Sequence, residues 1–108
     1  MIKRVLRSLL SRPATVRYPF VKPEPARGTR GGISFNMDRC DLCQDCERVC
    51  PSSSIKIYQD SGRIEYQPFR CIYCHICVRT CMQRAITPSE MVRGPAYEKS
   101  VDVYEVHR

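Results

Sequence analysis

The chain has 108 residues and a formal net charge of +7, which bounds it to one small domain with extensions. Residues 1–30 hold eight basic residues and one acidic residue, so this stretch accounts for the whole net charge. A basic arm suits nucleic acid, an anionic membrane surface or an acidic partner protein. The sequence has no zinc-finger, helix-turn-helix or RNA-binding aromatic pattern, so we expect no nucleic-acid partner.

Residues 1–12 have the pattern of an amphipathic helix that ends near Pro13. Its apolar residues recur at spacings of three and four, and basic residues occupy much of the remaining surface: Ile2, Val5, Leu6, Leu9 and Leu10 are apolar. The segment is too short and too charged to span a bilayer. Three interpretations remain open: a helix lying in a membrane interface, a helix packed on another protein, or an organellar transit peptide.

Residues 13–32 are predicted to form an extended basic connector. Prolines and glycines are too frequent here for a helix or a central strand: Pro13, Pro19, Pro23, Pro25, Gly28, Gly31 and Gly32. The connector either lies along a partner or is a mobile linker. We therefore predict a first region, residues 1–32, made of an N-terminal amphipathic helix and an extended basic arm.

All eight cysteines of the chain lie in two runs with the same spacing, C-x2-C-x2-C-x3-C. Each residue of the second run lies 31 positions after its counterpart; the runs are Cys40, Cys43, Cys46, Cys50 and Cys71, Cys74, Cys77, Cys81. This is the spacing of bacterial iron–sulfur proteins, in which the fourth cysteine of each run binds the other cluster. The predicted cofactors are two [4Fe–4S] clusters. Their predicted ligands are Cys40, Cys43, Cys46 and Cys81 for the first cluster, and Cys50, Cys71, Cys74 and Cys77 for the second.

Two other uses of the cysteines fit the sequence less well. Disulfides form in oxidising compartments, and no signal peptide is visible. Zinc sites usually combine two separated CxxC pairs or mix cysteine with histidine, whereas each run here holds four cysteines close together.

Short strands are predicted on both sides of the cysteine runs, at residues 33–39, 55–58 and 64–66, with a turn at Asp60-Ser61-Gly62. The 31-residue repeat extends to apolar residues, since Ile33, Phe35 and Ile55 precede Ile64, Tyr66 and Ile86 by that interval. Residues 89–108 form a last region, predicted as a C-terminal docking tail. Its alternating end, Val101-x-Val103, fits a strand or a tail equally.

The stretch from Ile33 to Thr87 resembles a bacterial-type two-cluster ferredoxin domain, on the segments CDLCQDCERVCP and CIYCHICVRTCM and their 31-residue repeat. The resemblance implies an α+β fold over residues 33–88, with pseudo-twofold symmetry, two short hairpins and two short helices. Residues 1–32 contain TVRYP and then RGTRGG directly before the first strand. They resemble the start of the two-cluster subunit of respiratory complex I and of membrane-bound, energy-converting [NiFe] hydrogenases.

These resemblances imply an electron-relay subunit with two [4Fe–4S] clusters in a membrane-bound oxidoreductase. Such a subunit is non-catalytic, so no catalytic residue is expected. It would lie on the cytoplasmic side of the cell membrane as a peripheral protein, held by residues 1–30 and by other subunits of a respiratory or hydrogenase complex. The short chain favours the hydrogenase type over complex I, and a free soluble ferredoxin is a further alternative.

One residue departs from the pattern of this family. Pro51 follows Cys50, but Met82 follows Cys81, where these ferredoxins usually repeat the proline. The Met82 N–H is a possible donor to a cluster sulfur, so we hypothesise a higher potential for the cluster bound by Cys81. Three other side chains are interpreted as packing or solvated residues rather than as ligands or proton relays: Tyr73, His75 and His107.

Overall fold

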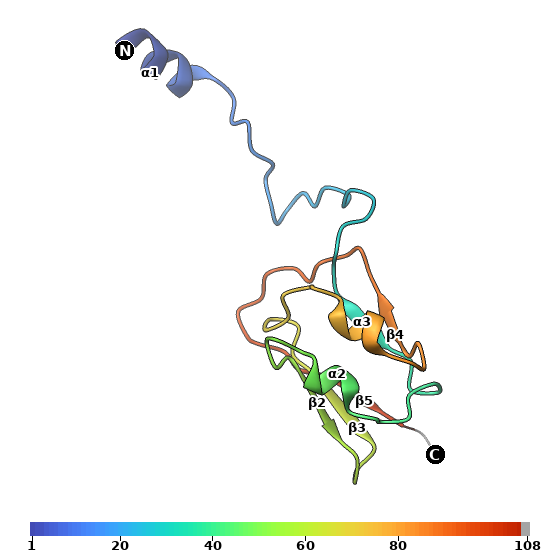
Figure 1. Ribbon diagram of the computed structural model, residues 1–108. Coiled ribbons are helices and arrows are strands. Elements are labelled where there is room, and N and C mark those ends of the chain that lie inside the picture. The colour runs from blue at the N-terminus through green and yellow to red at the C-terminus, as the bar shows by residue number, and fades with distance from the viewer. Residues whose placement is uncertain (107–108) are drawn as a thin grey trace.

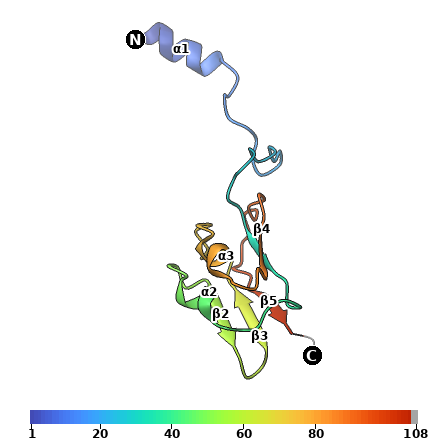
Figure 2. The same ribbon diagram turned by 45° about the vertical axis from the view of Figure 1, so that its right-hand side comes forward.

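A computed structural model describes residues 1–106. Within that range the chain forms three helices, α1 (Ile2–Leu10), α2 (Asp45–Arg48) and α3 (Ile76–Thr80). It also forms five strands: β1 (Ile33–Phe35), β2 (Ile55–Tyr58), β3 (Arg63–Tyr66), β4 (Ile86–Pro88) and β5 (Asp102–Glu105). The described part measures 67 × 27 × 22 Å, because α1 lies far from the rest at the end of an extended arm (Figures 1 and 2).

Two antiparallel ladders join the two halves of the repeat. β1 pairs with β4, and a second sheet has the order β2-β3-β5. In the first ladder Phe35 is opposite Ile86, and in the second Tyr66 is opposite Ile55. Both pairs are related by the 31-residue interval, so the two ladders have the same register. The predicted small α+β ferredoxin fold is confirmed, and each of these two ladders takes one strand from each repeat.

The two predicted hairpins differ in their connections. β2 and β3 form a true hairpin, whose turn has Gly62 at a φ of +62° and a hydrogen bond from the Gly62 N–H to the Gln59 carbonyl. β1 and β4 instead pair across the domain, β1 at the start of the first repeat and β4 at the end of the second. β1 is shorter than the predicted strand because Asn36 begins a turn, in which its side-chain oxygen accepts the Asp38 N–H at 3.0 Å.

The end of the described chain is a strand. β5 pairs with β3, with Tyr104 opposite Ile64. The Tyr104 ring lies against Phe35, with ring centroids 5.2 Å apart, whereas Val101 and Val103 are exposed. The alternation seen in the sequence therefore directs Tyr104, and not the two valines, toward the core.

The buried core is small for a domain of this length. It consists of residues from both ladders and both cysteine loops: Ile33, Phe35, Leu42, Cys46, Ile55, Ile57, Ile64, Tyr66, Cys77, Ala85 and Ile86. Two of these are predicted cluster ligands. Apolar burial alone stabilises so small a unit only marginally, so its stability depends on what the cysteines bind.

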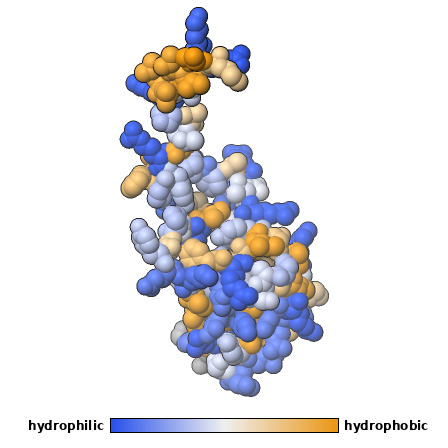
Figure 3. Space-filling model, turned by 90° about the vertical axis from the view of Figure 1, so that its left-hand side faces the viewer, coloured by the Kyte–Doolittle hydropathy of each residue, from blue (hydrophilic) through white to orange (hydrophobic). Residues whose placement is uncertain are grey.

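Helix α1 matches the predicted amphipathic segment but contacts no core residue. All five of its apolar side chains are exposed: Ile2, Val5, Leu6, Leu9 and Leu10. They appear as an orange patch at the top of Figure 3. No helix in residues 1–106 combines the length and the apolar character needed to cross a bilayer.

Candidate iron–sulfur sites

The eight cysteines surround two separate hollows. Cys40, Cys43, Cys46 and Cys81 line one hollow, which we name the first site. Cys50, Cys71, Cys74 and Cys77 line the other, the second site. The space between protein atoms is similar in the two, ≈ 330 and ≈ 320 Å³, part of it open to solvent. Each hollow thus takes three cysteines from one run and the fourth from the other; the assignment of these cysteines as cluster ligands stays a prediction.

Residues with left-handed backbone conformation curl each cysteine loop around its hollow. Leu42 and Gln44 have φ values of 58° and 65°, and their counterparts Tyr73 and His75 have 54° and 57°. A non-glycine residue rarely adopts such angles, so their occurrence at equivalent positions in both loops indicates a shared structural requirement.

The helices place the last two cysteines of each run. Cys46 lies in α2 and Cys77 in α3, so the third cysteine is the helical one. Cys50 and Cys81 follow just beyond the helix ends. From there each reaches the hollow of the opposite run.

Burial makes the Cys40 and Cys46 thiols of the first site hard to ionise without a positive partner. Burial, together with the neighbouring Cys40 and Cys77, raises the pKa of Cys46 to about 12. Burial also raises the pKa of Cys40. At Cys43, a backbone hydrogen bond from Asp45 lowers the pKa. Burial and the Asp41 carboxylate outweigh this effect, and the pKa is raised. A metal centre supplies the positive charge that four neighbouring thiolates require.

Serine hydroxyls distinguish the second site. Burial raises the pKa of Cys77 to about 11. Burial also acts to raise the pKa of Cys50, but hydrogen bonds from Ser54 and Ser52 outweigh it, and the pKa is lowered. The Cys50 Sγ lies 3.2 Å from the Ser54 Oγ and 3.6 Å from the Ser52 Oγ, and 3.4 Å from the Ser54 N–H nitrogen.

The cysteine spacing alone does not reveal this role of Ser52 and Ser54. The signal was present in the repeat, because the residues 31 positions later, Gln83 and Ala85, carry no hydroxyl. Only the backbone contact is repeated: the Ala85 N–H donates to the Cys81 Sγ at 3.4 Å.

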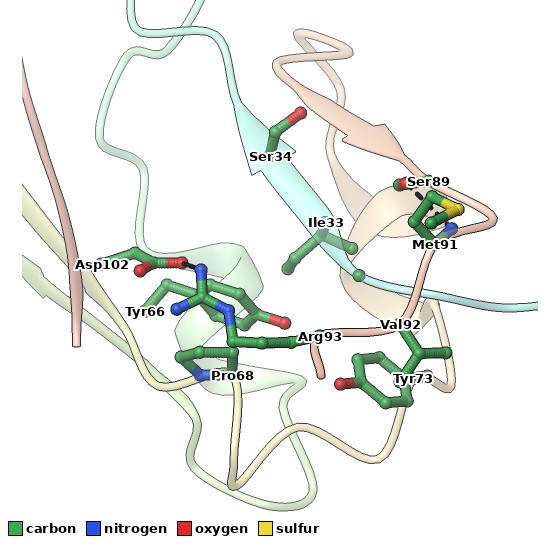
Figure 4. Close-up of a pocket in the computed structure, with 11 residues that line it drawn as sticks. Ile33, Ser34, Tyr66, Pro68, Tyr73, Ser89, Met91, Val92, Arg93 and Asp102 are labelled. Atoms are coloured by element: carbon green, nitrogen blue, oxygen red, sulfur yellow. Dashed lines mark hydrogen bonds and ion pairs between the residues drawn. The ribbon is translucent and has the colours of Figure 1, made fainter. Parts of the chain in front are cut away.

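Tyr66 places another hydroxyl beside Cys71 of the second site, although its side chain lines a neighbouring hollow. Its side chain is 2% exposed, and within residues 1–106 its hydroxyl oxygen has no hydrogen-bond partner of standard geometry. Burial and the adjacent Cys71 thiol raise its pKa. Figure 4 shows Tyr66 and Tyr73 on the wall of one open hollow, whose rim carries the Arg93–Asp102 ion pair. Such a buried hydroxyl requires an acceptor, and the Cys71 sulfur is the one beside it.

Of the two histidines, the structure describes only His75. His75 lines the second site and is partly buried rather than at the surface; its Nε2 lies 2.8 Å from the Gly31 carbonyl oxygen. This hydrogen bond joins the second cysteine loop to the arm. His107 lies outside the described residues.

The donor set of each site fits an iron–sulfur cluster. Four soft thiolates are the ligands that such clusters take. In residues 1–106, no three Cys, His, Asp or Glu side chains are grouped closely enough to hold a single metal ion. Instead, the sulfurs of each set are arranged around a hollow.

Comparison with protein families identifies the domain that contains the two cysteine runs. Residues 32–82 match the sequence profile of the family described as "4Fe-4S dicluster domain". These residues form a 4Fe–4S dicluster domain. Its cofactors are two [4Fe–4S] clusters, as the cysteine runs predicted.

Similar curated proteins extend the comparison over part of the domain. A stretch of 40 residues is 52% identical to the NAD(P)H-quinone oxidoreductase subunit I of Synechococcus sp., covering 37% of this chain and 19% of the relative. The chloroplastic subunit I of Chlorokybus atmophyticus is 48% identical over 40 residues, covering 37% of this chain and 23% of the relative. The match thus spans about a fifth of the length of these relatives.

A solved structure is similar over more of the chain. It is a chain from the structure titled "membrane-bound sulfane sulfur reductase (MBS), an archaeal respiratory membrane complex". The two chains are 26% identical with a TM-score of 0.58. The similarity covers 83% of the present chain and 51% of the other, so it extends beyond the dicluster domain.

Proposed function

We propose that the chain is an electron-relay subunit of a membrane-bound oxidoreductase complex. The clusters supply one-electron transfer. The protein's own residues hold two clusters within one small domain, each through cysteines of both runs. Phe35, Ile57 and Ile86 line the first site, and Ile33 and Ile55 line the second, where they limit the access of water.

The observation that carries this proposal is helix α1 on its extended arm. Its apolar stripe is exposed and lies apart from the domain (Figure 3). In a free soluble ferredoxin the apolar face of this helix would stay exposed to water, whereas in a larger assembly another surface buries it. The relatives are named as a subunit of a quinone oxidoreductase and as part of a respiratory membrane complex, which agrees with this interpretation.

The three regions of the chain have distinct roles in this proposal. Residues 1–32 anchor the protein along a membrane arm on the cytoplasmic side, through partner subunits and peripheral membrane contact. Residues 33–88 carry the clusters, with the ligand sets given above. Residues 89–108 dock on a neighbouring subunit, which fits the position of β5 as an outer strand of its sheet.

The finer proposal is that the complex is of the energy-converting [NiFe] hydrogenase type. It is supported by the resemblance of residues 1–32 to the start of such subunits. The complex I type and a sulfane sulfur reductase type are the competing assignments.

Anaerobic purification of the tagged chain from native membranes tests both levels. Co-elution of membrane-complex subunits supports the relay role, and the identity of the large subunit selects the type. A variant with Leu6→Glu and Leu9→Glu is expected to lose the complex while keeping its iron and sulfide; Arg7→Glu, on the polar face, is the matched control. A wild-type chain that is recovered alone, with both clusters, from the soluble fraction contradicts the proposal.

A further inference from the structure

The two sites differ in a consistent way at positions related by the 31-residue repeat. The second site has Ser54 beside Cys50 and Tyr66 beside Cys71. The corresponding positions at the first site are Ala85, beside Cys81, and Phe35, which lines the first hollow. In each of these two pairs, the residue at the second site carries a hydroxyl and its counterpart at the first site is apolar.

The geometry makes these hydroxyls effective donors. Ser54 is 1% exposed and its Oγ is 3.2 Å from the Cys50 Sγ, so water does not compete for the hydrogen bond. The Tyr66 hydroxyl is buried next to the Cys71 thiol and has no hydrogen-bond partner within residues 1–106. The acceptor beside it is the Cys71 sulfur, a predicted ligand of the second site.

A carboxylate at the first site acts in the same direction. Asp41 lines the first hollow, whereas its repeat counterpart at the second is Ile72. Within the described chain, no acidic side chain lines the second hollow. A second acidic residue of the first hollow, Asp45, is paired with Arg48 and its charge is partly compensated.

Hydrogen bonds and charge change a cluster's potential through the extra negative charge of the reduced form. A donor to a sulfur stabilises that form and raises the potential. A nearby carboxylate destabilises it and lowers the potential. The donors raise the potential of the second site and the carboxylate lowers that of the first, so both differences make the second potential the higher one.

We propose that the second site has the higher reduction potential, so that a single electron shared by the two clusters rests at Cys50, Cys71, Cys74 and Cys77. Moving the electron there oxidises the first site by one electron and reduces the second by one, with no bond made or broken. This inference rests on the proposed relay function and ligand sets. It runs opposite to the effect hypothesised for the Met82 N–H, and Met82 itself is 86% exposed.

The test is an anaerobic redox titration of the full-length, cluster-loaded chain, followed by electron paramagnetic resonance. The wild type is expected to show two midpoints. Ser54→Ala with Tyr66→Phe is expected to lower only the upper one, and to reduce the preference of the electron for the second site by up to about tenfold, which is about 59 mV. Ser61→Ala and Tyr58→Phe remove exposed hydroxyls from the same hairpin and are the matched controls, expected to move neither midpoint.

Two variants test the first site in the opposite direction. Ala85→Ser adds a hydroxyl beside Cys81, and Asp41→Asn removes the charge but keeps an oxygen that can accept the Cys43 N–H. Each is expected to raise only the lower midpoint. Iron and sulfide analysis shows which variants hold both clusters, and only those are compared.

Three results overturn the inference: one common midpoint in the wild type, no shift with Ser54→Ala and Tyr66→Phe, or a shift of the lower midpoint in that variant. None of them depends on a partner complex. A chain that shows the expected midpoints but binds no membrane complex contradicts the proposed function and leaves this inference standing.

Discussion

Phe35 and Tyr66 occupy equivalent positions in the two repeats and contact each other in the core. Their ring centroids are 6.0 Å apart, with an angle of 61° between the planes. Each residue lies five positions before the first cysteine of its own run. Edge-to-face contact of this kind is a favoured aromatic geometry. The pair therefore joins the two halves of the domain at the point where the two cysteine loops begin.

Truncating Phe35 is expected to destabilise the domain. Phe35→Ala removes the contacts with Tyr66 and Tyr104 and leaves a cavity, at a cost of about 3–5 kcal/mol. The expected result is faster loss of the brown absorbance of the clusters at a fixed temperature under anaerobic conditions. Phe20→Ala, on the exposed arm, removes the same atoms outside the core and should leave the rate unchanged. Equal rates in the two variants would contradict the role given to the aromatic pair.

Removing iron is expected to unfold the dicluster domain. Its core is small and includes Cys46 and Cys77, whose burial without metal leaves either neutral thiols or uncompensated charges. Binding of the metal is then coupled to folding. Treatment with a strong chelator and a reductant should abolish the circular dichroism of the strands and the dispersion of the amide NMR signals. A chelated chain that keeps dispersed signals for β2 and β3 shows instead that the apolar core suffices.

The 31-residue interval made much of the fold predictable. It fixed which residues are equivalent, and the equal registers of the two ladders follow from Ile33, Ile64 and their partners. It also separated the cysteines into two sets. The interval did not predict the contact between His75 and the Gly31 carbonyl, because these residues are 44 positions apart and are not related by the repeat. It also did not predict strand β5. The apolar alternation there lies on Val101 and Val103, which are exposed, whereas the residue that contacts Phe35 in the core is Tyr104.

The differences between the repeats were harder to interpret than the repeat itself. Ser54 looks like a turn residue in the sequence, and only its burial beside Cys50 reveals a hydrogen bond to sulfur. Met82 drew attention because it replaces an expected proline. Burial forces a polar atom to find a partner, so the buried Ser54 hydroxyl is informative about the site once the structure is known.

Paired cysteine substitutions test the crossed ligand sets. Cys40→Ser with Cys81→Ser removes two ligands of the first site and leaves the second site complete, so about half of the iron should remain. Cys40→Ser with Cys50→Ser removes one ligand from each site and should affect both. The two variants carry the same number of substitutions, so each is the control of the other. If each cluster were held by a single run, the second variant would keep the intact cluster and the first would not.

Gly31 is expected to be the least replaceable residue of the arm. A Cβ added there would lie 2.6 Å from the Ser89 carbonyl oxygen and closer still to that of Met91, whereas a Cβ at Gly32 would lie 3.6 Å from the Met91 oxygen. The Gly31 N–H also donates to the Ser89 carbonyl at 2.9 Å. Gly31→Ala must therefore separate the arm from the segment after β4, at a cost of about 1–3 kcal/mol for overpacking. Limited proteolysis of the loaded chain should show faster cleavage between residues 27 and 33 in Gly31→Ala than in Gly32→Ala. Similar cleavage of the two variants would mean that the segment after β4 moves away freely, and that this contact does not hold the arm.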